Sequence, residues 1–132
     1  MLSVMTTKKD DMTVGKLWAV TLDCADPKPL AEFWSKALGG TIAHSSEAFI
    51  GVELPGGPWI GAYAIDDYVP PTWPDGDAGK QFHLDLSVSD LDDAERQLLE
   101  LGARKADHQP EPERWRVLLD PAGHPFCITN MG

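Results

Sequence analysis

The chain has few basic residues. Among its 132 residues, 11 are lysine or arginine and 21 are aspartate or glutamate, which gives a formal net charge of −10 at pH 7. A protein that binds the phosphate backbone of nucleic acid needs a basic surface, so this balance argues against DNA and RNA as partners. The same charge favours the approach of a cationic small molecule. The simpler alternative is that the acidic surface keeps the protein in solution.

Cysteines and long apolar runs are also scarce. The chain has two cysteines, Cys24 and Cys127, and no CxxC motif, so we expect free thiols in a reducing compartment and no disulfide framework. No stretch reaches the roughly 18 apolar residues of a membrane span. Residues 1–15 are polar and lack the apolar run of a signal peptide. We therefore expect a cytoplasmic protein with a flexible tail over residues 1–15 and one domain over residues 16–132.

What the chain does have is one order of elements that occurs twice. "LWAVTLDC" (17–24) alternates like a strand, a helix starts at Asp26 and Pro27, and three short strand-like runs follow up to residue 65. After a linker rich in Pro and Gly (66–81), "FHLDLSV" (82–88) begins the same order again. A helix capped by Ser89 or Asp90 and three more short strands follow it, up to residue 130.

This repeat predicts an α+β fold. Two βαβββ modules, about residues 17–65 and 82–130, would each place one helix against one face of a small sheet. The helix-free faces of the two curved sheets would then line a cleft between the modules.

Alternation along the strands predicts which side chains line that cleft. In the first strand the apolar residues share one face, which leaves Thr21 and Asp23 on the other. In residues 82–88 the leucines likewise leave His83, Asp85 and Ser87 opposite them. The same alternation turns Cys127 towards the cleft. Since polar groups inside a fold need partners, a concave polar face is a candidate binding site.

Three segments carry a resemblance to a known family. "FHLDLSVSDLDDAERQLLELGA" (82–103), "DPAGHPFC" (120–127) and "PPTWPDG" (70–76) resemble the vicinal oxygen chelate superfamily. More narrowly, the chain is similar to actinobacterial glyoxalase-like proteins that are grouped with bleomycin-resistance proteins. The resemblance covers about residues 16–130 and implies the paired-module fold, with a homodimer by analogy to many relatives.

The resemblance also implies where a metal would be bound. The ligand positions of metal-dependent members fall on Ala19, Tyr63, His83 and Cys127, and His83 alone matches the usual ligand type. Because a stable site usually has three or more protein ligands, we expect no metal cofactor. The alternative is a divalent ion held by His83 and Cys127 with an oxygen from Asp85 or Asp23.

His83 therefore has three candidate roles. It could be a cleft histidine hydrogen-bonded to an aspartate, a general acid or base without a metal, or a metal ligand. Trp73 could stack on a flat ligand or could plug the linker between the modules. The predicted catalytic residue is His83, and the predicted ligand-binding residues are Asp23, Tyr63, Trp73, His83, Asp85 and Cys127.

Two classes of function follow. The first is a binding protein that sequesters a small, cationic or aromatic molecule in its cleft, as the resemblance to resistance proteins implies. The second is an enzyme of the lyase, isomerase or dioxygenase type, which would be metal-dependent or would use His83 for proton transfer. The fold alone does not decide between them.

Overall fold

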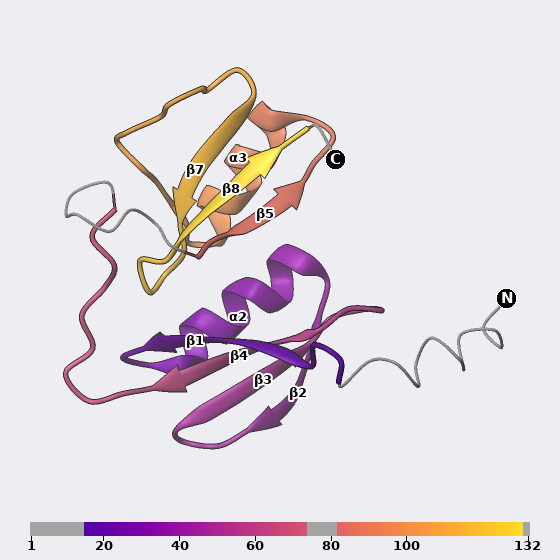
Figure 1. The fold of residues 1–132 in the computed structure, drawn as a ribbon, viewed down its shortest axis with the longest axis vertical. Coiled ribbons are helices and arrows are strands. Elements are labelled where there is room, and N and C mark those ends of the chain that lie inside the picture. The colour runs from indigo at the N-terminus through magenta and orange to yellow at the C-terminus, as the bar shows by residue number, and fades with distance from the viewer. Residues whose placement is uncertain (1–14, 74–81, 131–132) are drawn as a thin grey trace, which may run out of the picture.

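The computed structural model describes residues 15–73 and 82–130, and these form two four-stranded sheets, each with one helix (Figure 1). The first half of the chain forms β1 (Ala19–Cys24), α2 (Pro27–Leu38), β2 (Thr41–Ser45), β3 (Phe49–Glu53) and β4 (Trp59–Ala64). The second half forms β5 (Leu84–Ser87), α3 (Leu91–Leu101), β6 (Arg104–Lys105), β7 (Trp115–Leu119) and β8 (Pro125–Thr129). The predicted α+β fold of two βαβββ modules is confirmed. Apart from Gly15, the predicted tail lies outside the described residues, as does the linker from residue 74 to residue 81.

The two sheets have the same topology. Their strand orders are β1-β4-β3-β2 and β5-β8-β7-β6. The first and last strands of each module are parallel neighbours, and the other pairs are antiparallel. The strands β1 and β5 are therefore edge strands, and each lies on the side of its sheet that is nearer to the other module (Figure 1). Among the described residues, no strand pairs with their outer edges.

Both helices begin at an aspartate. The side chain of Asp26 accepts a hydrogen bond from Lys28 N at 3.1 Å, and Pro27 occupies the first turn of α2, where a missing N–H costs nothing. The side chain of Asp90 accepts from Asp93 N at 3.1 Å and caps α3, so Asp90 and not Ser89 is the cap. The helix α2 ends at Gly39, whose positive φ of 68° suits glycine. Neither helix in the described part of the chain is long and apolar enough to cross a membrane.

An aromatic cluster on α2 joins the two modules. Phe33 and Trp34 are 2% and 1% exposed, and both pack against Phe126 of β8, with ring centroids 5.9 and 5.0 Å apart respectively. Burial of one such side chain stabilises a fold by about 1.5–3 kcal/mol. The helix α2 therefore packs on its own sheet and also on the second module, which fixes how the modules meet.

As large apolar side chains, Trp18 and Trp34 are both expected from the sequence to lie in the core, and for Trp18 this expectation is wrong. Trp18 is 63% exposed, and its ring lies 5.6 Å from that of Trp59. Trp18 precedes β1 by one residue, where the alternation of the strand no longer dictates the direction of the side chain. The tryptophan pair therefore lies on the surface of the first module.

Candidate functional site

Among the described residues, two cavities of more than 600 Å³ follow the line where the modules meet. One, of about 610 Å³, is lined by residues of α2, α3 and β5 and is called the helix-side cavity below. The other, of about 820 Å³, lies between β1, the residues that lead into β5 and the turn before β8, and is called the junction cavity. Both volumes fall within the range of about 300–1,000 Å³ that is typical of small-molecule sites. Their polar groups therefore decide which is the better candidate.

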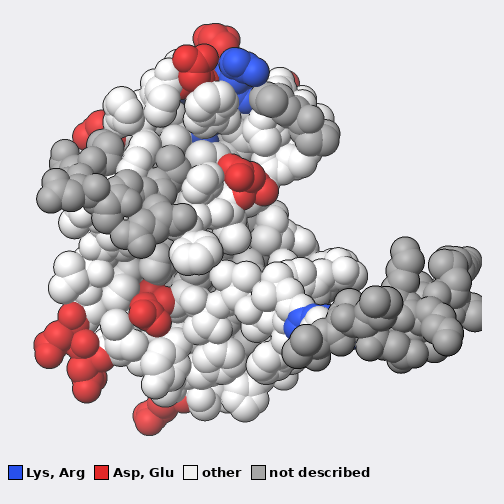
Figure 2. Space-filling model, viewed as in Figure 1, with Lys and Arg blue, Asp and Glu red and all other residues white. Residues whose placement is uncertain are grey.

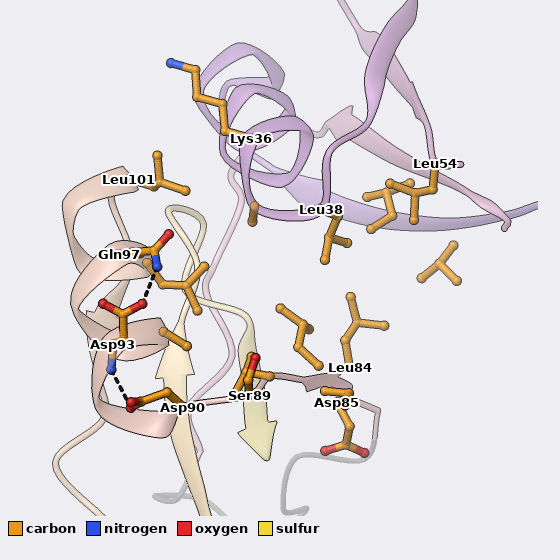
Figure 3. Close-up of a pocket in the computed structure, with 18 of the residues that line it drawn as sticks. Lys36, Leu38, Leu54, Leu84, Asp85, Ser89, Asp90, Asp93, Gln97 and Leu101 are labelled. Carbon is orange, nitrogen blue, oxygen red and sulfur yellow. Dashed lines mark hydrogen bonds between the residues drawn. The ribbon is translucent and has the colours of Figure 1, made fainter. Parts of the chain in front are cut away.

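The polar side chains of the helix-side cavity interact largely with one another (Figure 3). Asp90 caps α3, and Asp93 accepts from Gln97 Nε2 at 2.7 Å. Figure 3 shows that Lys36 extends away from the cavity and that the Asp85 carboxylate is directed away from Leu38 and Leu54. The remaining walls are mostly leucine and alanine. This cavity offers apolar surface with little to orient a ligand.

The junction cavity combines apolar walls with polar groups from both modules. Thr21 and Asp23 come from β1, and His83 immediately precedes β5. Leu17 and Phe82, which are 68% and 93% exposed, also line it. Figure 2 shows this side of the molecule as mostly uncharged. A few polar groups in an apolar hollow are the usual composition of a ligand site.

The outer edge of β1 adds backbone groups to the junction cavity. Trp59 N donates to Trp18 O at 2.8 Å and Ile65 N donates to Cys24 O at 3.0 Å, so the even-numbered residues of β1 direct their backbone groups towards β4. In a parallel ladder the alternate residues, here Ala19, Thr21 and Asp23, direct theirs outwards. His124 Nε2 lies 2.7 Å from Asp23 O, on this outer edge. The N–H and C=O groups of Ala19 and Thr21 are thus directed to the side on which the cavity lies.

A buried carboxylate stabilises the far wall of the junction cavity. Asp120 is fully buried; its Oδ2 accepts from Trp34 Nε1 at 3.0 Å, and its Oδ1 accepts from Ala122 N at 3.0 Å and from His124 N at 2.9 Å. Burial raises the pKa of Asp120. The charge of His124 and the three hydrogen bonds lower this pKa, but the effect of burial is larger. Asp120 thus connects α2 of the first module to the turn of the second.

The Asp120–Trp34 contact was not predicted from the sequence. The sequence "PAGHP" (121–125) is typical of a structural turn, which fits the bonds that Asp120 makes to it. Tyr68 reinforces this turn, because its hydroxyl donates to Ala122 O at 2.8 Å, and burial raises the pKa of Tyr68 to about 12. Trp34 lies 86 residues from Asp120 in the sequence, and no local signal connects two residues so far apart.

Three predicted site residues come together on the helix-free face of the second sheet. His83 Nε2 lies 3.2 Å from Asp85 Oδ1. Cys127 of β8 is opposite Asp85 in the strand register, and one donor atom from each of the three residues lies within 4.8 Å of the other two. Cys127 is 4% exposed and packs with Ala106 and Val117. Asp23 lines the junction cavity with His83, although it is not part of this group.

Trp73 and Tyr63 occupy other positions. Trp73 is half-buried against the apolar group that contains Cys127, and its ring lies 5.5 Å from that of His108. This packing favours the plug over the stacking lid. Tyr63 is 45% exposed on the first sheet and lines neither cavity.

The helix-free face of the first sheet carries aromatic rings above two glycines. Gly51 and Gly61 are partners in the β3–β4 register. A Cβ atom on Gly61 would lie 2.6 Å from Phe49 Cε1 and 3.0 Å from Thr21 Oγ1, and one on Gly51 would lie 2.9 Å from Trp59 Cε3. The absence of side chains at these positions therefore lets both rings lie close to the sheet.

We expect Gly61→Ala to lower the free energy of unfolding by about 1–3 kcal/mol, because the new methyl group must displace the Phe49 ring. Gly57→Ala is the matched control, since its Cβ would meet nothing closer than 3.9 Å. Urea denaturation of both variants checks this. Equal stability of Gly61→Ala and the wild type would show that the Phe49 ring does not lie against Gly61.

The family comparison agrees with this architecture. The sequence model of a family described as glyoxalase-like domain matches residues 19–129, which include both sheets and both helices. No curated protein matches the chain.

Solved structures with the same fold come from several bacteria. A glyoxalase/bleomycin resistance protein/dioxygenase family enzyme from Burkholderia phytofirmans is 23% identical, with a TM-score of 0.63 over 86% of this chain and 97% of that one. A possible glyoxalase from Bacillus cereus is 18% identical, with a TM-score of 0.65 over 89% and 99%. A variant of the fosfomycin resistance protein of Listeria monocytogenes, complexed with Mn(II), is 18% identical, with a TM-score of 0.66 over 90% and 91%. At these identities the similarity concerns the fold.

Proposed function

We propose, from the premise that this chain belongs to the family of glyoxalase-like domains, that it binds a small, planar, cationic molecule in the junction cavity. The observation that carries the proposal is the cavity of about 820 Å³, in which apolar walls from both modules surround Thr21, Asp23 and His83. A planar ligand fits because Leu17 and Phe82 offer exposed apolar surface beside these groups.

Charge supports a cationic ligand. The chain has a formal net charge of −10, and Asp23 places one carboxylate at the cavity itself. A protein field of this sign raises the local concentration of cations and speeds their association. The solved fosfomycin resistance protein has the same fold, and a role in resistance is proposed by this analogy alone. At 18% identity the analogy does not extend to the ligand.

An enzyme is the second candidate, and the contact between His83 and Asp85 favours it. With 3.2 Å between His83 Nε2 and Asp85 Oδ1, the carboxylate can orient the imidazole, which then acts as a general acid or base beside the cavity. Mass spectrometry of a compound incubated with the protein separates the two candidates. A binding protein returns the compound unchanged, whereas an enzyme converts it in the wild type and not in His83→Ala.

The binding proposal is tested with two tricyclic probes that differ in charge. Tryptophan fluorescence of the full chain is titrated with 9-aminoacridine, a cation at pH 7, and with 9-anthracenecarboxylate, an anion. We expect the cation to bind about tenfold or more tightly at low salt, with the difference shrinking as salt is added. Quenching by neither probe, or tighter binding of the anion, would contradict the proposal. The homodimer and the cytoplasmic location stay predictions.

A further inference from the structure

His124 belongs to the turn before β8 and also lines the junction cavity. The proline and glycine of "PAGHP" account for a turn, but a turn does not require a histidine at this position. The His124 ring reaches across to the first module, where its Nε2 lies 2.7 Å from Asp23 O and 3.3 Å from the Tyr68 hydroxyl. These contacts hold the imidazole in a defined place at the cavity wall.

The two contacts show which nitrogen of the ring carries the proton. A carbonyl oxygen only accepts hydrogen bonds, so Nε2 donates to Asp23 O. The Tyr68 hydroxyl donates its own hydrogen to Ala122 O at 2.8 Å, and its oxygen can accept from Nε2 as well. In the neutral imidazole the proton is therefore on Nε2, and Nδ1 keeps a lone pair that can accept a hydrogen bond.

Nδ1 of His124 is accessible. Within residues 15–73 and 82–130, no group makes a hydrogen bond to it. In the same part of the chain, every buried side-chain nitrogen or oxygen of a residue that is not exposed has a hydrogen-bond partner. Since His124 is half-buried and Nδ1 lacks a partner, Nδ1 is not a buried atom. A molecule in the junction cavity can therefore donate a hydrogen bond to it.

Other polar groups of the cavity are already engaged. Both carboxylate oxygens of Asp120 accept hydrogen bonds, and this residue is fully buried. His83 Nε2 lies 3.2 Å from Asp85 Oδ1. Asp23, in contrast, is exposed at the cavity, and its backbone is in contact with His124. The cavity thus offers a cation one charged acceptor at Asp23 and one neutral acceptor at His124.

We propose that His124 determines the specificity of the junction cavity, because its Nδ1 accepts a hydrogen bond from an N–H group of the ligand. The cavity then selects planar cations that carry N–H groups, such as amidines and amino-substituted nitrogen heterocycles. A quaternary cation of similar shape displaces water from Nδ1 without replacing its hydrogen bond, and so loses affinity. Asp23 attracts both kinds of cation, whereas His124 distinguishes them. This role of His124 rests on the proposed function, since it concerns the ligand of the same cavity.

Two dyes test the proposal in the wild type: proflavine and its analogue methylated at every nitrogen, 10-methylacridine orange. Both are tricyclic cations at pH 8, where an ordinary histidine is neutral, and only proflavine has N–H groups. Fluorescence anisotropy of each dye, titrated with the full-length protein, gives the two dissociation constants. We expect proflavine to bind about tenfold more tightly. Equal affinities would overturn the role of His124 while cation binding stands. Binding of neither dye would overturn the proposed function, and the role of His124 with it.

Two substitutions then separate the nitrogens of the ring. Asparagine places its amide oxygen near the position of Nδ1, and glutamine places its amide nitrogen near that of Nε2. His124→Asn should therefore keep most of the preference for proflavine. His124→Gln should keep the hydrogen bond to Asp23 O and lose most of the preference.

The pattern across the two variants decides the assignment. A preference that survives in His124→Gln would come from the bulk of the methyl groups, and one lost equally in both variants would depend on the bond to Asp23 O. Either result would overturn the assignment to Nδ1. Circular dichroism checks that both variants fold, and the comparison of the dyes in the wild type needs no variant.

Discussion

Replacing Asp120 with alanine is expected to lower the free energy of unfolding by about 3 kcal/mol or more. The change removes the acceptor of three hydrogen bonds, from the buried Trp34 Nε1 and from the part-buried backbone N–H groups of Ala122 and His124. It also separates α2 from the turn before β8, where the two modules meet. Urea denaturation followed by far-ultraviolet circular dichroism measures the loss.

Two milder variants separate the parts of this contact. In Asp120→Asn the amide N–H₂ faces Trp34 Nε1, so two donors oppose each other while the bonds to the turn can remain. Trp34→Phe removes the same bond from the other side. If the Asp120–Trp34 hydrogen bond accounts for most of each effect, the double variant loses less free energy of unfolding than the two single variants lose together. Strict additivity would show that the Asp120–Trp34 bond contributes little.

The pH dependence of this stability has a definite sign. Because burial raises the pKa of Asp120 above its value in the unfolded chain, the folded state holds this proton more tightly. The stability that this group contributes is complete below the unfolded pKa of about 3.9 and falls as pH rises through the raised folded pKa. The stability of the wild type relative to Asp120→Asn should therefore decline over that interval. A constant difference would contradict the raised pKa.

Reversing the charge of Asp23 is expected to weaken the binding of 9-aminoacridine by about 10- to 100-fold, because a cation then replaces the carboxylate at the junction cavity. Asp23→Lys leaves the bond between His124 and the Asp23 carbonyl available, since that bond uses the backbone. Tryptophan fluorescence titration of the variant at low salt measures the change.

Glu53→Lys is the control that separates a local effect from the general field. Glu53 is exposed at the end of β3 and lines neither cavity, yet its replacement changes the net charge by the same amount. We expect Glu53→Lys to keep most of the affinity. Equal losses of affinity in both variants would show that the net charge of the protein attracts the cation. The position of Asp23 at the cavity would then have no effect of its own.

The fold could be predicted because its signals are local. The aspartate caps at Asp26 and Asp90, the glycine at the end of α2 and the alternation in "LWAVTLDC" each depend on a few neighbouring residues. The order of elements that occurs in both halves of the chain then predicted the two βαβββ modules. Trp18 was expected in the core with Trp34, but it precedes β1 and is 63% exposed.

The candidate site could be predicted in part. Alternation correctly grouped His83 with Asp85, because His83 immediately precedes β5 and continues its extended course. It could not show that Cys127 is opposite Asp85, since that depends on the β5–β8 register. Tyr63 was included through the family resemblance, although it lines neither cavity. The Asp120–Trp34 bond is a contact between modules, and no pattern within either module predicts it.

The location of the ligand is tested most directly by NMR. The full chain labelled with ¹⁵N is titrated with 9-aminoacridine, and the change in chemical shift is recorded for each amide and indole N–H. If the junction cavity is the site, the largest changes occur at Thr21, Asp23, His83, Leu84 and the Trp34 indole, which line it from both modules. Changes confined to Trp18, Trp59 and Tyr63 on the surface of the first module, or to α3 beside the helix-side cavity, would contradict the account.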